Sequence, residues 1–223
     1  MPMMRISAKR LCATLTGLLL LVVGIGTDAI AGPFEDALAA AQSGDYSTAN
    51  WALRPLADHG NAVAQFDLGS MYESGHGVPQ DYAAAMKWFR LAAEQGNAMA
   101  QYDLGSMYYN GHGVAQDYTE AAKWFQRAAE QDYTWAQFYF GFFLANGFGV
   151  PKDLIQAHLW LNLATISHFD PPFGSLRIMD EKERHALGNL ATGARDKVEK
   201  EMTKDQIAEA QMLAGQWKPK LQR

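Results

Sequence analysis

A Gly-His-Gly loop occurs twice in this chain, and its two histidines are the residues that most suggest a metal site. The stretch GSMYESGHGVPQDY spans 69–82, and GSMYYNGHGVAQDY repeats it at 105–118. Glycine-rich loops can hold a metal ion, but two imidazoles that share one ion must each come within about 2 Å of it. His76 and His112 hold equivalent places in successive units, where packed helices are about 8–10 Å apart. The spacing therefore predicts two separate, exposed loop residues and no metal site.

Asp67 and Asp103 form the other pair that could do chemistry. A separation of about 9 Å would suit the two carboxylates of an inverting glycosidase. The repeat alone explains their spacing, and the sequence holds no H-E-x-x-H, no G-x-S-x-G and no phosphate-binding glycine loop. The only cysteine, Cys12, lies in the N-terminal leader. We therefore predict a protein with no catalytic residue and no cofactor.

Residues 1–31 have the layout of a secretory signal. A basic start is followed by an apolar run from about Leu11 to Ile25 and by the small-residue triplet Ala29-Ile30-Ala31. We expect a Sec-type signal cleaved after Ala31, which places the mature protein in the periplasm or outside the cell. A membrane anchor is the competing interpretation, although the run is shorter than the roughly 20 residues that a spanning helix needs.

The charge of the chain limits its partners. The formal net charge is −5, and removal of the leader, with three basic residues and one acidic residue, changes it to −7. Nucleic acid and anionic membrane surfaces bind basic footprints, so neither is an expected partner. No later segment is apolar for long enough to span a bilayer, which predicts no stable membrane span in the mature chain.

An internal repeat organises most of the sequence. Residues 60–95 and 96–131 are identical at 26 of 36 aligned positions, and 132–167 is a more diverged third copy. Apolar residues recur at steps of three and four, which predicts two helices per unit. Residues 32–59 fit a degenerate N-terminal helix pair, and 168–223 fit capping C-terminal helices. The first of the capping helices is predicted to share one packing face among Leu187, Leu190, Ala194 and Val198. A fixed period of this size predicts an all-α fold, an α/α right-handed superhelical solenoid of antiparallel helix pairs.

The recurring glycines and acids in each unit have structural roles in this interpretation. Left-handed caps are expected where the first helix of a unit ends, and side-chain caps where the second helix begins. Glycines inside the first helix indicate close contact with another helix, because glycine there costs about 1 kcal/mol relative to alanine. The left-handed caps are predicted at Gly75, Gly111 and Gly147. The side-chain caps are predicted at Asp45, Asp81, Asp117 and Asp153. The glycines inside the first helices are Gly69, Gly105 and Gly141.

The unit resembles a known repeat family. Its pattern A-x-A-Q-x-x-L-G-x-M-Y-x-x-G-x-G-V-x-x-D, followed by A-x-x-W-x-x-x-A-A, resembles the Sel1-like repeat, a relative of the tetratricopeptide repeat. The resemblance covers about residues 44–167, and the tail looks like the closing helices of exported bacterial members. It implies a scaffolding, assembly or regulatory role, including control of envelope signalling by binding the exported domain of a sensor.

One side of the three first helices is the predicted binding surface for a protein or peptide. The resemblance implies that these helices line the inner surface of the solenoid, and the stripe is polar in two repeats and aromatic in the third. The predicted partner-binding residues are Asp67, Ser70, Asp103, Ser106, Asn110, Trp135, Tyr139 and Phe142. Large rigid side chains act as anchors at such surfaces. Alternatively, the C-terminal extension covers the aromatic end through Phe169, Phe173, Leu176 or Ile178.

Three functions are compatible with the sequence. The favoured one is a non-enzymatic protein–protein interaction module in the bacterial cell envelope. The alternative is a cell-wall-associated hydrolase or a protein that binds β-lactams or muropeptides, as some cysteine-rich exported relatives do. Those relatives carry a disulfide in each repeat, and this chain has no such cysteines. The third is a structural spacer that self-associates. The residues do not determine the partner or the oligomeric state.

Overall fold

The computed structural model describes residues 28–166 and 181–220, and every regular element in these ranges is a helix. The chain divides into two compact units, Met1–Gly32 and Pro33–Arg223, and the repeats belong to the second. The helices are α2 (Asp28–Gln42), α3 (Tyr46–Asp58), α4 (Ala62–Ser74), α5 (Tyr82–Glu94), α6 (Ala98–Asn110), α7 (Tyr118–Ala129), α8 (Thr134–Asn146), α9 (Leu154–Ile166), α10 (Glu181–Glu199) and α11 (Lys204–Gln216). No helix in the described ranges combines the length and the apolar character that a membrane crossing requires.

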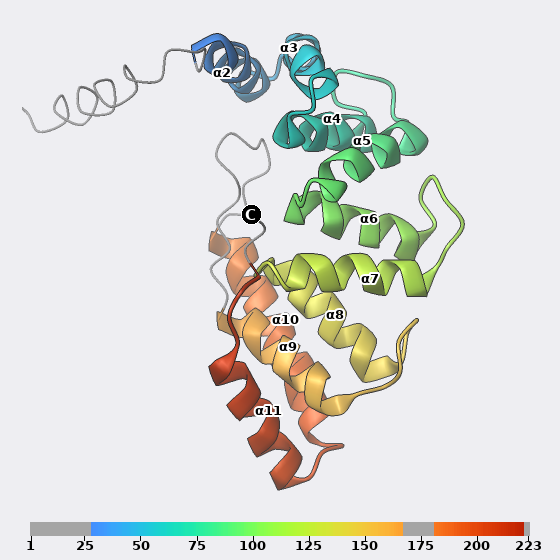
Figure 1. The fold of residues 1–223 in the computed structure, drawn as a ribbon, viewed down its shortest axis with the longest axis vertical. Coiled ribbons are helices and arrows are strands. Elements are labelled where there is room, and N and C mark those ends of the chain that lie inside the picture. The colour runs from blue at the N-terminus through green and yellow to red at the C-terminus, as the bar shows by residue number, and fades with distance from the viewer. Residues whose placement is uncertain (1–27, 167–180, 221–223) are drawn as a thin grey trace, which may run out of the picture. The chain divides into compact units, whose positions relative to one another are not determined.

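From α3 to α10, each helix packs against the next one along the chain (Figure 1). The most extensive contacts join α4 to α5, α6 to α7 and α8 to α9, which are the helix pairs of the three repeats. Helix α9 also packs against both α10 and α11, so the two C-terminal helices cover the last repeat. These contacts confirm the predicted all-α solenoid of antiparallel helix pairs with capping C-terminal helices.

Side chains begin the helices at the predicted positions. Asp117 Oδ1 accepts hydrogen bonds from the backbone N–H groups of Thr119 (2.8 Å) and Glu120 (3.1 Å) at the start of α7. Asp45, Asp81 and Asp153 accept backbone N–H bonds in the same way at α3, α5 and α9. The first helices have caps that the sequence interpretation missed, because Asn61 and Asn97 accept from the N–H groups of Ala64 and Ala100. Each cap satisfies a donor that the helix itself leaves unpaired.

Glycines bring the helices of a pair together. A Cβ atom at Gly105 would lie 2.7 Å from Cδ1 of Phe125, and one at Gly69 would lie 2.5 Å from Cδ1 of Phe89. These distances confirm the predicted close contact, since a methyl group at either position would overlap the aromatic ring. The buried rings that fill this space form the centre of the core, because Phe89 and Phe125 are both 0% exposed.

The loop between the two helices of a repeat packs onto the preceding repeat. Gly113 has φ of +72°, and a Cβ atom there would lie 2.7 Å from the carbonyl oxygen of Tyr82. The left-handed conformation and the lack of space both favour glycine at this position. His112, the residue before it, is exposed and stacks on the ring of Tyr82 with centroids 4.8 Å apart. The loop histidines therefore join successive repeats.

Candidate partner-binding surface

Only some residues of the predicted stripe on the first helices are exposed to solvent. Ser70 and Ser106 are partly exposed and Asn110 is exposed, but the residues Asp67 and Asp103 are 0% and 3% exposed. Helical spacing predicts that residues share one side of a helix, and it does not predict how deeply neighbouring segments bury that side. Partner binding by the stripe remains a prediction, and the two aspartates in it are almost completely buried.

A depression of about 310 Å³ lies beside α4 at the N-terminal repeat. Its walls include Ser70, Ser74 and the Tyr46–His76 pair, whose rings stack with centroids 4.7 Å apart. The hydroxyl of Ser74 donates to the backbone carbonyl of Ser70 at 2.8 Å, as is common for serine within a helix. Asp67 lies at the base of this depression.

The aromatic part of the stripe belongs to one continuous cluster. The ring of Tyr139 stacks on Phe125 with a centroid distance of 5.1 Å, and it meets Tyr102 at 5.8 Å and Trp135 at 6.4 Å. Tyr139 and Trp135 remain partly exposed while Phe125 is buried. Offset and edge-on ring pairs of this kind contribute about 0.5–1.5 kcal/mol beyond their buried area. The cluster therefore holds large apolar side chains rigidly at the surface of α8.

Burial raises the pKa of Tyr139 above its ordinary value, and the nearby Tyr109 raises it further, against a smaller lowering by a hydrogen bond from Tyr102. The cause is desolvation, because a phenolate is less stable than a phenol where water is excluded. The hydroxyl of Tyr139 is hydrogen-bonded with Tyr102 inside the aromatic cluster.

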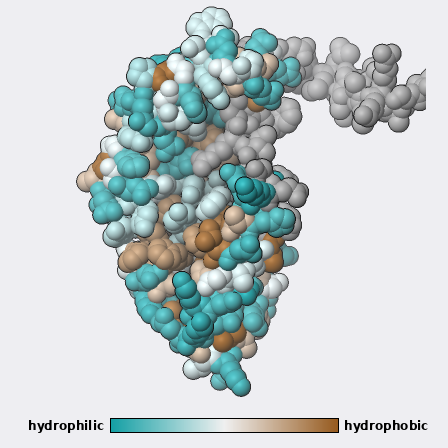
Figure 2. All heavy atoms as spheres, turned by 180° about the vertical axis from the view of Figure 1, so that it is seen from behind, coloured by the Kyte–Doolittle hydropathy of each residue, from teal (hydrophilic) through white to brown (hydrophobic). Residues whose placement is uncertain are grey.

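A cleft of about 490 Å³ separates the aromatic side of α8 from α10. Phe138 and Phe142 line it from α8, and Leu190, which is 53% exposed, lines it from α10. Polar and charged side chains also border it, namely Asn146, Asn189, Lys197 and Glu201. Figure 2 shows apolar side chains gathered over this part of α8 and α10, with hydrophilic side chains around them. The cleft is thus an apolar surface with a polar rim.

Phe142 is the one residue lining this cleft that belongs to the predicted partner-binding set, and the two large apolar side chains Phe138 and Leu190 were not predicted. Phe138 lies one residue before Tyr139 and was outside the predicted stripe, although its ring meets that of Tyr139 at a centroid distance of 5.4 Å. Leu190 was expected to share a packing face with Leu187 and Val198, which are 0% and 5% exposed. That expectation was wrong for Leu190, because α8 and α9 cover only the side of α10 that carries the other two. The aromatic composition of α8 was the one available signal for Phe138.

The predicted cover for the aromatic end lies outside the described residues, since Phe169, Phe173, Leu176 and Ile178 all fall within 167–180. Within the described part, α10 supplies one wall of the cleft. The alternatives of an open and a covered aromatic end therefore both remain predictions.

The loop histidines lie apart from any metal-binding group in the described part of the chain. His76 and His112 are exposed and stack on tyrosines of the preceding repeat. No group of three histidine, cysteine, aspartate or glutamate side chains in residues 28–166 and 181–220 is arranged to hold a metal ion. The side chains at the described surface can therefore make aromatic and apolar contacts and hydrogen bonds.

Comparison with known proteins identifies the repeat. A family model described as the Sel1 repeat matches residues 62–97, 98–133 and 136–165. A Sel1 repeat protein from Oxalobacter formigenes is 35% identical over 61% of this chain and 95% of that chain, with a TM-score of 0.49. The chain therefore belongs to the Sel1 repeat family.

A second solved structure extends the comparison of the fold. It is a protective antigen of uropathogenic Escherichia coli strains that displays an SLR fold, with 25% identity and a TM-score of 0.51. The match covers 77% of the present chain and 41% of that chain, so this protein spans less than half the length of the antigen. No curated protein matches the chain.

Proposed function

We propose that this protein is a non-enzymatic interaction module of the bacterial cell envelope that binds a peptide or protein segment in the cleft between α8 and α10. Sel1 repeats are in general protein–protein interaction modules, and the chain contains three of them. The observation that carries the proposal is the apolar cleft itself, in which Phe142 and the half-exposed Leu190 face a common space. Binding sites for peptides combine such anchors with a polar rim that fixes register.

The aromatic cluster supports the proposal because it is preorganised. Phe138, which lines the cleft, is held by ring contacts to Trp135 and Tyr139. Phe142 is held in the same way by Phe148, so a partner would not have to order either anchor. Ordering a flexible side chain on binding costs about 0.5–1.5 kcal/mol, and a rigid aromatic avoids most of that cost.

The alternative function, hydrolysis of cell-wall material or binding of β-lactams and muropeptides, has weaker support. It would use Asp67 and Asp103 as an acid pair, and both residues are almost completely buried. A general acid or base must reach the group with which it exchanges a proton. A purified protein that hydrolyses muropeptides, and loses the activity in the double variant Asp67→Asn, Asp103→Asn, would reverse this preference.

Cross-linking to Lys197 provides the test of the cleft, because this lysine lines it and carries a reactive amine. The full chain is cross-linked in envelope extract, and cross-linked peptides are identified by mass spectrometry. We expect one partner to be joined through Lys197 and to be lost from the variant Leu190→Glu. Met212→Glu is the matched control, since Met212 on α11 is 54% exposed and lies outside the cleft. Equal capture by both variants would contradict the proposed site.

The proposed envelope location rests on the sequence of the leader and needs its own test. The N-terminus of the protein is determined by mass spectrometry after isolation from the native cell. Export with cleavage after Ala31 leaves Gly32 as the first residue. Recovery of an intact Met1 terminus in the cytoplasmic fraction would contradict export and leave the cleft proposal untouched.

A further inference from the structure

A second depression, of about 540 Å³, lies along the exposed side of α5 and is separate from the cleft between α8 and α10. Apolar atoms dominate its lining, with Met86 at the base and Leu91, 45% exposed, on one wall. Gly113, in the loop of the following repeat, closes one side. No residue predicted for partner binding lines this depression.

Two basic side chains border the apolar base. Lys87 and Arg90 lie on the same side of α5 and line the depression together with a single acid, Glu94. The Arg90 guanidinium donates to the hydroxyl of Tyr108 at 2.9 Å, which fixes its position without neutralising its charge. Among the described residues, no ion pair involves Lys87 or Arg90.

The equivalent bases of the neighbouring repeats do have acidic partners. Lys123 of α7 corresponds to Lys87, and its Nζ lies 2.6 Å from Oε1 of Glu120. Arg54 of α3 corresponds to Arg90, and its Nε lies 3.5 Å from Oδ2 of Asp58. On α5, two exposed bases therefore lie beside an apolar depression without an ion pair among the described residues, and Glu94 offsets only one of the two charges.

Charge complementarity indicates what would bind there. Two positive groups on a chain whose overall charge is −5 attract carboxylates locally, and the apolar base favours a large aliphatic or aromatic side chain. An acidic amphipathic helix satisfies both requirements, because residues at i and i+4 share one side while flanking glutamates reach the rim. A basic or purely polar segment would leave either the charges or the apolar base unsatisfied.

We infer that the exposed side of α5 binds an acidic amphipathic segment of a partner protein, with an apolar side chain between Met86 and Leu91 and carboxylates paired with Lys87 and Arg90. This surface is independent of the α8–α10 cleft.

Binding of labelled synthetic peptides to the full chain, followed by fluorescence anisotropy, tests the inference. The probes are helical peptides with Leu or Phe at i and i+4 and flanking Glu, beside a matched set with Gln in place of every Glu. We expect the Glu set to bind and the Gln set to bind about tenfold more weakly, and added salt should reduce the difference. Lys87→Glu and Leu91→Ser should each weaken binding by a similar factor, as truncation of a central contact does.

Matched variants test whether peptide binding is specific to this surface of α5. Lys123→Glu makes the same charge change at the same repeat position of α7 and should alter binding less than about twofold, because rim charges away from the site contribute little. Leu190→Glu, which disrupts the α8–α10 cleft, should leave peptide binding unchanged. Circular dichroism checks that each variant remains helical.

Several results would overturn the inference. These are failure of every acidic peptide to bind, equal binding of the Glu and Gln sets, and equal loss in Lys87→Glu and Lys123→Glu. Self-association in analytical ultracentrifugation that Lys87→Glu abolishes would also overturn it, because the occupant would then be a second copy of this chain.

Discussion

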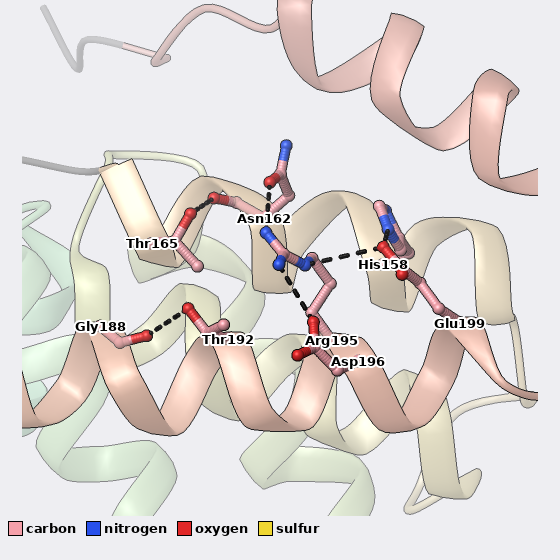
Figure 3. Close-up of polar contacts among 8 residues, drawn as sticks. All are labelled: His158, Asn162, Thr165, Gly188, Thr192, Arg195, Asp196 and Glu199. Atoms are coloured by element: carbon pink, nitrogen blue, oxygen red, sulfur yellow. Dashed lines mark hydrogen bonds and ion pairs between the residues drawn. The ribbon is translucent and has the colours of Figure 1, made fainter.

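Nε2 of His158 lies 2.7 Å from Oε1 of Glu199, and this contact joins the last repeat helix, α9, to the closing helix α10 (Figure 3). The histidine side chain is 1% exposed, and Glu199 is also 3.7 Å from Nε of Arg195. Arg195 in turn donates to Oδ1 of Asn162 on α9 at 3.3 Å. Polar contacts between buried or half-buried groups thus hold the cap against the repeats.

Removal of the Glu199 carboxylate should destabilise the protein. In Glu199→Ala the buried Nε2 of His158 has no acceptor or ion partner, and an unsatisfied buried polar group costs about 1–3 kcal/mol. Urea unfolding followed by circular dichroism measures the difference in free energy. Glu201→Ala is the control, because its pair with Lys152 is exposed on both sides and should contribute about 0–1 kcal/mol. Equal effects of the two substitutions would show that the His158 contact carries no stability.

Addition of a methyl group at Gly105 should overfill the core. In Gly105→Ala the new Cβ would lie 2.7 Å from the ring of Phe125, and displacement of a buried ring should cost about 1–3 kcal/mol. Gly188→Ala on α10 is the matched control, because a Cβ there meets nothing within 4 Å. The control should stabilise its helix by up to about 1 kcal/mol. Thermal unfolding of the two variants should therefore move in opposite directions.

Loss of the cap at Asp117 should weaken the start of α7. Asp117→Ala removes the acceptor of the Thr119 and Glu120 backbone N–H groups, and loss of a cap of this type costs about 1 kcal/mol. Asp117→Asn keeps an oxygen acceptor and should retain most of the stability. Hydrogen exchange of these two amides, measured by NMR, should accelerate in the alanine variant alone. Unchanged protection would contradict the capping role.

Tyr139 should make stability depend on pH in the alkaline range. Burial raises its pKa above the ordinary value of 10.0, so the unfolded chain releases the phenol proton at a lower pH than the folded protein does. The contribution is complete below pH 10 and is lost as pH rises through the folded-state pKa. Urea unfolding across this range should show a shallower loss in Tyr139→Phe than in the parent. An identical change in Tyr46→Phe would argue against a specific effect of Tyr139.

Much of the local structure follows from short patterns. Asp81 and Asp117 precede helical apolar periodicity in near-identical units, and each begins a helix as predicted. Gly105 lies inside a helix where a glycine needs a packing reason, and the ring of Phe125 supplies it. Such features were predictable because a cap or a close contact recurs with the same neighbours in every repeat.

The repeat period, the helix pairs and the aspartate caps of the second helices can be predicted from the amino-acid sequence, because they depend on residues a few positions apart. Which of those residues reach the surface depends on how distant segments pack. Helical spacing predicted that Asp67 is a surface residue, but its side chain is 0% exposed. The same spacing predicted that Leu190 is a core residue, but it is 53% exposed. Likewise, His158 and Glu199 are 41 positions apart and meet only because α10 folds back onto α9. Depth of burial depends on distant segments that cover a helix, and periodicity carries no information about them.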